Sequence, residues 1–271
     1  MKKLSPLQLF AGLLILTTGF SACQKSSVSD SGVPAGQNQL QLVLTDGPSL
    51  IFDSIFVDIR QVEVRVVKTD GSEVWQDLGI QPAVYNILRL RNGVEAILAT
   101  TLIPDGRIDK LRLTLGTNNS VVKAGITYPL YLHNGVTQYT ISIDDDVDED
   151  GDADHLKFWL DFDGHGSIIE TSPNHFELAA SLHHFSHHNS AELEGKIKPA
   201  AALPAIVKVV TGSDTLTALP SSEGEFKVRG IQASTVTLII RPSNNYKDSV
   251  MNNIQVRRGD DTNIGTITLH Q

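Results

Sequence analysis

The sequence is poor in the residues that build covalent cross-links and thiolate metal sites. Its 271 residues include one cysteine, two tryptophans and two methionines. A single cysteine cannot form an internal disulfide, and it cannot supply the several thiolates of a structural zinc or iron–sulfur site. Any metal bound by this chain must therefore use oxygen or imidazole ligands.

Basic charge is also scarce. The chain has 22 Lys and Arg residues against 31 Asp and Glu residues, which gives a formal net charge of −9. Such a chain does not coat a phosphate backbone, so we expect no nucleic-acid binding. Hydrophobic residues make up 41% and charged residues 20% of the chain, which excludes wholesale disorder and suggests about two globular domains.

Long hydrophobic runs are absent, and the one short run lies near the N-terminus. Residues 9–16 are apolar and follow Lys2 and Lys3, whereas a membrane-spanning helix needs about 20 apolar residues. This pattern predicts a signal peptide over residues 1–22. Small residues then precede Cys23, an arrangement that resembles a bacterial lipobox, in which the cysteine thiol takes a diacylglycerol and the new amino terminus is acylated, for example with palmitate.

We therefore expect Cys23 to be a lipid anchor, which several acyl chains hold on a bilayer. The alternative is an ordinary secretory signal with an incidental cysteine. Residues 23–38 are rich in Ser and Gly and predict a flexible tether. We expect a lipoprotein of the cell envelope, in the outer membrane of a Gram-negative bacterium, and the side of the membrane that it faces stays open.

After the tether the sequence is typical of β-strands. Alternating apolar residues at 40–44, 55–59 and 62–66 have the period of a strand with one buried face, and the phase shift predicts a bulge near Arg60 and Gln61. Further strands are expected at 73–78, 84–91, 95–102, 107–115, 127–132, 138–143, 156–162 and 175–182. The dipeptide Asn92-Gly93 favours a hairpin turn.

A second unit begins near Ala191, where strand and turn alternate about every ten residues. The sequence thus predicts an all-β protein: a larger β-sandwich or barrel-like domain over residues 39–188, and a smaller seven-strand β-sandwich over residues 191–271.

Many short motifs in the first unit resemble one family. The segments are Leu44-Thr45-Asp46-Gly47-Pro48, the Trp75 strand, the run from Val84 to Leu90 before Asn92-Gly93, the run from Leu102 to Arg107, Leu111-Arg112-Leu113, Leu160-Asp161-Phe162-Asp163 and Ser167-Ile168-Ile169. Together they resemble the lipoprotein family with domain of unknown function 4382, roughly over residues 39–185. No activity is assigned to that family, so the resemblance implies a lipoprotein but no reaction.

The second unit resembles a carboxypeptidase-regulatory-like module with a transthyretin-like β-sandwich. The resemblance is carried by the motifs around Leu193-Glu194-Gly195, Gly224-Glu225-Phe226 and Gly265-Thr266-Ile267. Such modules usually act as spacers or binding domains, so the resemblance implies no catalysis.

The most acidic segment lies between residues 144 and 154. Asp146, Asp148, Asp150 and Asp154 occupy positions 1, 3, 5 and 9 of a calcium loop with Gly151 at position 6, but Lys157 stands where an EF-hand has its bidentate Glu. The hypothesis is a calcium loop between strands, completed by Asp161, Asp163 or water. The alternative is a solvated acidic hairpin tip without a ligand.

Histidines gather after this segment. Five of the nine fall in fourteen residues, among them His183, His184, His187 and His188. If this stretch is extended, His183 and His187 share one face and His184 and His188 the other, which would offer imidazole pairs to zinc or copper. The alternative is a polar linker surface whose charge rises as the pH falls toward 6.

Catalysis has little support in the sequence. Asp46, Asp161 and Asp163 could serve as the paired carboxylates of a glycosidase, although Asp46 before Gly-Pro is also a turn former, and no motif of a known hydrolase occurs. We expect no catalytic residue and a non-enzymatic envelope protein that binds the membrane through its lipid and presents a surface to a glycan or an envelope protein. The alternative is a polysaccharide hydrolase or its carbohydrate-binding subunit.

Overall fold

A computed structural model describes residues 33–34, 36–46, 49, 51–143, 155–164, 166–212 and 214–271. Within these ranges no helix is long and apolar enough to cross a membrane. The predicted signal peptide, Cys23, the tether up to residue 32 and the acidic segment with Asp146, Asp148, Asp150 and Asp154 lie outside the described residues.

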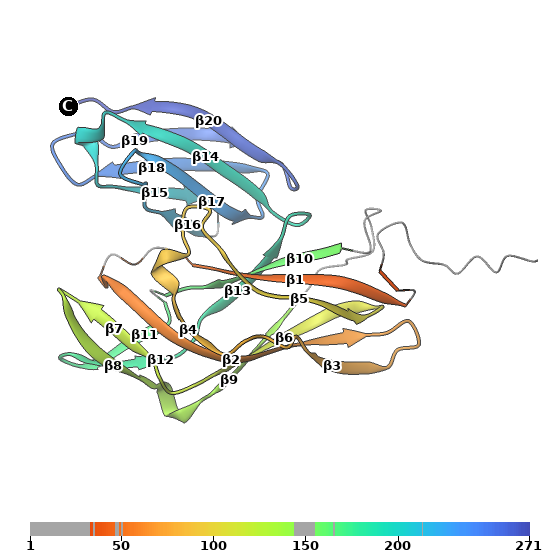
Figure 1. Ribbon diagram of the computed structural model, residues 1–271. Helices are drawn as coiled ribbons and strands as arrows, with labels where there is room; N and C mark the ends of the chain where they lie inside the picture. The colour runs from red at the N-terminus through yellow and green to blue at the C-terminus, as the bar shows by residue number, and fades with distance from the viewer. Residues whose placement is uncertain are drawn as a thin grey trace, which may run out of the picture.

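The strands between residues 37 and 186 form two facing sheets (Figure 1). The smaller sheet has the strand order β13 (Leu182–Ser186), β10 (His155–Phe162), β1 (Gln37–Thr45) and β5 (Ala96–Pro104). Its two central strands, β1 and β10, run parallel, while β5 and β13 pair antiparallel on either side. This small sheet is the layer that lies nearest the C-terminal part of the chain.

The larger sheet has nine strands. Its path is β11 (Ile168–Ser172), β12 (His175–Leu178), β8 (Ile126–Leu132), β7 (Ser120–Lys123), β2 (Ser54–Val67), β6 (Arg107–Leu115) and β9 (Gln138–Ser142), and β3 (Glu73–Asp77) and β4 (Ala83–Asn86) also pair with β2. β2 is long enough to pair with four neighbours, so it organises the whole sheet.

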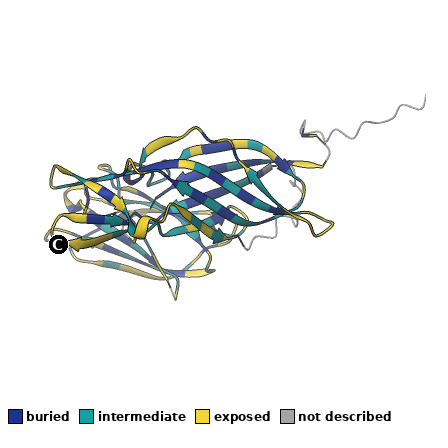
Figure 2. Ribbon diagram, turned by 90° about the horizontal axis from the view of Figure 1, so that it is seen from below, coloured by how far each residue is buried: buried dark blue, intermediate teal, exposed yellow. Residues whose placement is uncertain are grey.

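The core of this N-terminal sandwich lies between the two sheets. Leu40, Leu42 and Leu44 of β1 alternate with outward residues and are at most 1% exposed, as the period of a strand requires. Figure 2 shows buried and less buried bands alternating along many strands. They pack against inward residues of β2 such as Ile55 and Val57. Both sheets are open in the described part of the chain, so the prediction of a sandwich is confirmed and the barrel-like alternative is not what forms.

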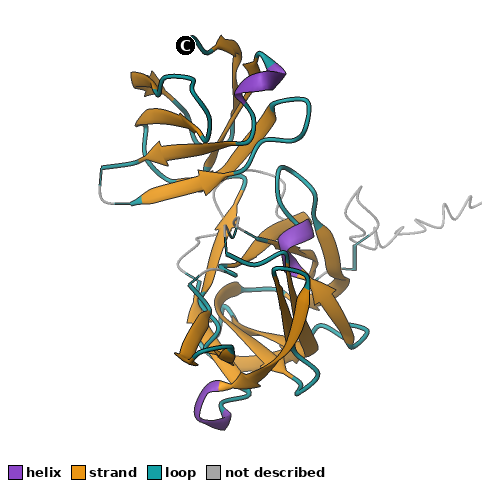
Figure 3. Ribbon diagram, turned by 90° about the vertical axis from the view of Figure 1, so that its left-hand side faces the viewer, coloured by secondary structure: helices purple, strands orange, loops and turns teal. Residues whose placement is uncertain are grey.

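The last third of the chain forms a second sandwich with a core of its own (Figure 3). One sheet is β17 (Glu225–Ile231), β14 (Ala191–Lys198) and β20 (Asp261–Thr268), and the other is β16 (Thr215–Ala218), β15 (Ala205–Val210), β18 (Thr235–Pro242) and β19 (Ser249–Gln255). The described residues thus contain the seven strands that the sequence predicts for this unit.

The predicted bulge is confirmed. The pairing of β2 with β6 shifts register between Ile59 and Gln61, so that Ile59 and Val62 both face the core although they are three residues apart. Arg60, the extra residue, is exposed.

The prediction of one strand over residues 84–91 is wrong. Only β4 is extended, and a 3₁₀ turn, η1 (Ile87–Arg89), follows it. The turn buries the consecutive side chains of Ile87 and Leu88, which the alternation of a strand would send to opposite faces.

The prediction of a hairpin at Asn92-Gly93 is also wrong. Both residues adopt the left-handed backbone conformation of a turn, with φ of 57° and 84°. However, β4 before the turn pairs with β2 in the large sheet and β5 after it pairs with β1 in the small sheet. The turn therefore carries the chain from one sheet to the other.

The stretch over residues 175–182 is likewise divided between sheets. β12 belongs to the large sheet, whereas β13 begins only at Leu182 and belongs to the small one. Two short strands, β7 and β11, have no counterpart among the strands expected from the sequence.

Candidate functional site

Part of the outward face of the small sheet, around Trp159 and Phe185, is covered by the C-terminal sandwich. Lys157, Trp159 and Asp161 of β10 alternate with core residues and share this face with Phe185 and His183, their neighbours on β13. Trp159 and Phe185 are 9% and 8% exposed, although they point away from the core of their own sandwich. We call the contact between the two sandwiches the joint.

The centre of the joint is apolar. Trp159 and Phe185 stack with ring centroids 5.5 Å apart and an interplanar angle of 8°, and Val43 of β1 is fully buried with them. Gly230 of β17 approaches so closely that a Cβ on it would lie 3.1 Å from Phe185 Cδ1. The absence of a side chain at Gly230 therefore lets β17 pack against Trp159 and Phe185.

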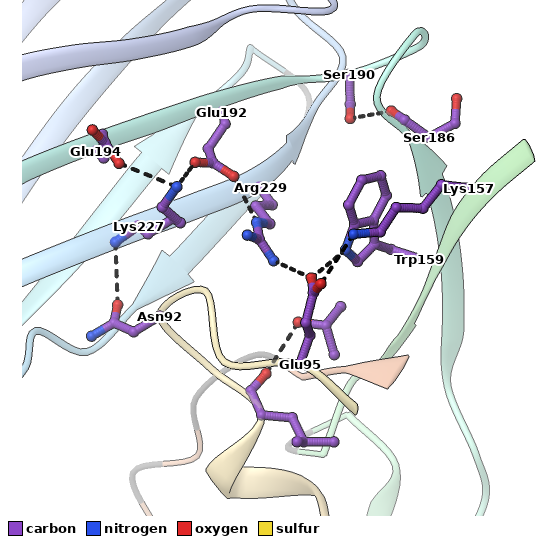
Figure 4. Close-up of polar contacts among 12 residues, drawn as sticks. Asn92, Glu95, Lys157, Trp159, Ser186, Ser190, Glu192, Glu194, Lys227 and Arg229 are labelled. Atoms are coloured by element: carbon purple, nitrogen blue, oxygen red, sulfur yellow. Dashed lines mark hydrogen bonds and ion pairs between the residues drawn. The ribbon is translucent and has the colours of Figure 1, made fainter. Parts of the chain in front are cut away.

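Beside this apolar centre, Glu95 joins the two sandwiches (Figure 4). It accepts hydrogen bonds from Trp159 Nε1 at 2.8 Å, Lys157 Nζ at 3.0 Å and Arg229 Nη1 at 2.9 Å. Burial raises the pKa of Glu95, but the bonds from Trp159 and Lys157 outweigh it, so the pKa lies below its ordinary value. Glu95 is therefore ionised at neutral pH.

On the C-terminal side, Arg229 and Lys227 are also held by acidic partners (Figure 4). Arg229 Nε donates to Glu192 at 2.6 Å, and Lys227 pairs with Glu192 and, at 3.1 Å, with Glu194. The cations of β17 are thus neutralised by carboxylates within the joint.

The Asn92 turn also belongs to the joint. Its side-chain amide donates to the carbonyl oxygens of Leu219 at 2.8 Å and Glu225 at 3.2 Å, and its Oδ1 accepts from the backbone N–H of Lys227 at 3.2 Å. The sequence marks Asn92-Gly93 as a turn but contains no sign of this partner, because the contacts join residues more than 120 positions apart.

A cavity of about 1030 Å³ opens between the sandwiches next to the joint. We call it the cleft. The N-terminal sandwich lines it with Asp46, Asp161, Asp163 and His183, and the C-terminal sandwich lines it with hydroxyl, amide and charged groups of β16, β17 and the loops beside them. Its walls thus combine polar groups with apolar side chains such as Leu182 and Leu216.

Three of the carboxylates form one group, which we call the acidic trio: Asp46, Asp161 and Asp163. Thr45, the last residue of β1, pairs with Asp161 of the parallel strand β10. Asp46 directly follows Thr45, so it lies at the same end of the small sheet as Asp161. All three residues belong to motifs that resemble the DUF4382 family, and the structure brings all three to the cleft.

Asp46 is the most buried member of the acidic trio, with 6% exposure. Its Oδ1 accepts a hydrogen bond from the backbone N–H of Gly164 at 2.9 Å, while its Oδ2 is buried and has no hydrogen-bond partner among the described residues. An unpaired buried oxygen is costly and rare in folded proteins, so this atom is an unusual feature of the cleft wall.

Burial raises the pKa of Asp46 to about 8, and the nearby charges of Asp161 and Asp163 add to that rise, while Gly164 and Arg91 oppose it. Burial also raises the pKa of Asp161 to about 6; His183 opposes this rise and Asp163 adds to it. At neutral pH the trio therefore presents a protonated carboxyl beside an ionised one, which can donate and accept hydrogen bonds at the same point.

The four histidines of the predicted second metal site are separated by the end of β13. His183 and His184 lie on the strand, which ends at Ser186, and His187 and His188 lie in the following turn with ring centroids 6.1 Å apart. The chain is therefore not extended through His188, and the predicted face-sharing pairs do not form. In the described part of the chain, no group of three or more His, Cys, Asp or Glu side chains is placed to hold a metal ion.

Comparison with solved structures finds only distant similarity. A type II cohesin–X-dockerin complex of Acetivibrio cellulolyticus is 24% identical over 29% of this chain and 56% of that chain, with a TM-score of 0.24. The shaft pilin SpaA of Lactobacillus rhamnosus GG is 9% identical over 86% of this chain and 97% of that chain, with a TM-score of 0.23. This chain therefore spans just over half of the cohesin–dockerin chain.

Comparison with known families gives a clearer result, although no curated protein matches the chain. The profile of the domain of unknown function DUF4382 matches residues 37–180, which is more than half of the chain. The match contains β1 to β12 and all three residues of the acidic trio. The chain therefore belongs to the DUF4382 family.

Proposed function

We propose that this chain is a non-enzymatic, lipid-anchored protein of the cell envelope that binds a glycan in the cleft between its two sandwiches. The cleft is the observation that carries the proposal. Its volume of about 1030 Å³ suits a small ligand of a few rings rather than the flat surface of a protein partner. The polar groups of its walls offer donors and acceptors to the hydroxyl groups of a saccharide.

The envelope location rests on the sequence. The predicted signal peptide and the lipobox-like segment before Cys23 support an anchor in the outer membrane of a Gram-negative bacterium. The Ser- and Gly-rich tether that follows would let the folded part reach material away from the bilayer.

A glycan array tests the binding function. Thr217 of β16 lines the cleft, so the substitution Thr217→Trp should fill it and abolish glycan binding. The control Thr127→Trp lies on exposed β8 of the large sheet and should bind like the unmodified protein. Equal binding by both variants would show that the cleft is not the site.

One observation favours a second function, a polysaccharide hydrolase. Asp46 is protonated and Asp161 is ionised at neutral pH, and a general acid beside a carboxylate is the pair that glycoside hydrolysis uses. A screen of polysaccharides for released reducing ends separates the two functions. Turnover that is lost in Asp161→Asn or Asp163→Asn would establish the hydrolase and contradict the non-enzymatic proposal.

A further inference from the structure

The strand β5 forms an open edge of the small sheet. Among the described strands it pairs with β1 alone, so its other side has no neighbouring strand. None of its residues, Ala96–Pro104, is charged, and Ile97 and Leu102 are 60% and 39% exposed. A bulge at Leu98 interrupts the pairing with β1, so the regular open edge is the stretch 99–104. Proteins commonly protect such edges with charged side chains, and β5 has none.

The hydrogen bonds at the end of β5 show which of its backbone groups face outward. The backbone N–H of Asp105 donates to the carbonyl oxygen of Gly36 at 3.0 Å, so every second residue before Asp105, back to Ala99, bonds to β1. Residues of an antiparallel strand alternate between their two sides. The N–H and C=O groups of Thr100 and Leu102 therefore point away from β1, which gives the edge two donors and two acceptors in one line.

A second copy of the same strand can complete this edge when it runs antiparallel. If Thr101 lies opposite the partner's Thr101, then Thr100 of each copy lies opposite Leu102 of the other. All four outward groups of each copy then form hydrogen bonds. Side chains directly opposite each other share a face, so Ala99 meets the partner's Ile103 in a second apolar contact.

Other registers of two β5 strands satisfy fewer groups. A shift by one residue places a group that bonds to β1 opposite a group that points outward. A shift by two residues either brings in Pro104, which has no N–H to donate, or meets the bulge at Leu98. In the register centred on Thr101 no like charges meet, because β5 is uncharged although the chain carries a net charge of −9.

We propose that two copies of this chain pair through β5, about a two-fold axis at Thr101, and so join their small sheets into one continuous sheet. The occupant of the edge is a second copy because the stretch 99–103 is complementary to itself in both hydrogen bonds and side chains. Each chain has one β5, so the pairing closes on itself as a dimer. Copies held in one membrane by the proposed lipid anchor would meet at a high effective concentration, which favours even a short interface.

A cysteine on the two-fold axis tests the pairing. The two Thr101 residues would form a non-hydrogen-bonded pair with Cα atoms about 4.5 Å apart, which a disulfide can span. When membranes of a Gram-negative host that carry the full chain are oxidised with copper phenanthroline, Thr101→Cys should give a dimer that reduction dissolves. The control Thr127→Cys, exposed on β8, and the unmodified chain, whose one cysteine is Cys23, should remain monomers.

Two substitutions at Thr100 test the backbone hydrogen bonds. In the Thr101→Cys chain, Thr100→Pro removes an outward N–H without removing a bond to β1, so it should abolish the cross-link. Thr100→Ser keeps the N–H and should keep the cross-link. A melting curve shows that each variant folds, and if the proline variant does not fold, Thr100→Lys, which places a charge on the edge, decides the result.

Several outcomes would overturn the dimer. They are the absence of a cross-link in Thr101→Cys, an equal cross-link in Thr127→Cys, and a cross-link that survives Thr100→Pro in a folded chain. A product that joins Thr101→Cys to a different protein, recognised by its mass, would also overturn self-pairing and would assign the edge to that protein. The inference goes beyond glycan binding and does not depend on it, so the glycan array judges the cleft separately.

Discussion

At the scale of single residues, polar side chains next to the cleft have roles that their sequence neighbourhood does not show. Asp46 precedes Gly-Pro, a setting typical of turns, yet it is buried with one oxygen unpaired. Asn92 precedes glycine, a setting typical of hairpins, yet its side chain ties two sandwiches together. In both cases distant contacts decide what the residue does.

The substitution Asp46→Asn should remove a pH dependence from the stability of the fold. The pKa of Asp46 is about 8 in the folded protein and near its ordinary 3.8 in the unfolded chain. The folded state therefore holds a proton that the unfolded chain loses, and the stability that this proton contributes is complete below about pH 4 and is lost as the pH rises through about 8.

Thermal melts between pH 4 and pH 9 measure this effect. Asp46→Asn should melt at a higher temperature than the unmodified protein at pH 8, and the two should converge toward pH 4, where the carboxyl is neutral. The exposed control Asp248→Asn should follow the unmodified protein throughout. Parallel curves for Asp46→Asn and the unmodified protein would contradict the raised pKa.

The substitution Asn92→Ala should weaken the joint. It removes three hydrogen bonds between the sandwiches and a residue that tolerates the left-handed conformation, so we expect a loss of about 2 kcal/mol in the free energy of unfolding. The control Asn253→Ala changes a residue with a similar φ of 58° and should cost only about 1 kcal/mol. Chemical denaturation measures both, and equal losses would show that only the backbone matters.

At the scale of elements, β10 is the strand on which the molecule depends most. One face supplies Leu156, Phe158 and Leu160 to the core, and the other supplies Lys157 and Trp159 to the joint. The same outward row continues into the cleft through Asp161. Strands of antiparallel sheets usually have one solvated face, whereas β10, which runs parallel to β1, has both faces occupied and so contributes to the core, the joint and the cleft.

The substitution Trp159→Leu should therefore destabilise the protein more than the same change at the other tryptophan. It removes the stack with Phe185 and the hydrogen bond to Glu95, which together should cost roughly 2 to 3 kcal/mol. Trp75 lies on the large sheet with Arg112 at 4.2 Å from its ring, and Trp75→Leu should cost about 1 kcal/mol or less. A greater loss for Trp75→Leu in urea denaturation would contradict the role given to the joint.

The acidic segment before β10 carries a prediction of its own. If Asp146, Asp148, Asp150 and Asp154 form a calcium loop, adding millimolar calcium should raise the melting temperature and chelation should lower it again. The double substitution of Asp148 and Asp150 to Asn should abolish the response. An unchanged melting temperature and no heat on titration would favour the solvated hairpin tip.

The sequence predicts local elements better than it predicts which distant elements pair with one another. The period-2 pattern predicts most strands and even the bulge at Arg60, because the alternation of buried and exposed residues is local. It fails at Ile87 and Leu88, where two consecutive apolar residues are both buried in a 3₁₀ turn. It also cannot say which sheet a strand joins, as β12 and β13 show.

The candidate site was predicted only in part. The sequence marks Asp46, Asp161 and Asp163 as candidate carboxylates, and the shared face of Asp161 and Asp163 follows from their spacing. Glu95 and Arg229 could not be predicted, because their contact exists only when the two sandwiches meet. Residues of this kind have no local pattern in the sequence.

At the scale of the whole molecule, two sandwiches share one joint and one cleft. The connection between them is short, because β13 ends at Ser186 and β14 begins at Ala191. Within it, the Ser190 hydroxyl donates a hydrogen bond of 2.7 Å to the Ser186 carbonyl oxygen (Figure 4). A short connection and a buried aromatic centre favour a fixed arrangement, which a cleft built from both sandwiches requires.

The membrane anchor is tested on the whole cell. In a Gram-negative host, Cys23→Ser should move the protein from the membrane fraction to the soluble fraction, and mass spectrometry should find acyl chains only on the unmodified protein. The control Ser26→Ala, in the tether, should stay with the membrane. An unacylated protein that is soluble without any substitution would contradict the lipoprotein prediction.

The position of β1 has a mechanical consequence. β1 is the first strand of the fold and lies in the middle of the small sheet, between β5 and β10. Pulling β1 out of the fold by its tether would require breaking its hydrogen bonds to both neighbours, whereas an edge strand has one neighbour. The fold should therefore withstand tension along its tether better than one that begins with an edge strand.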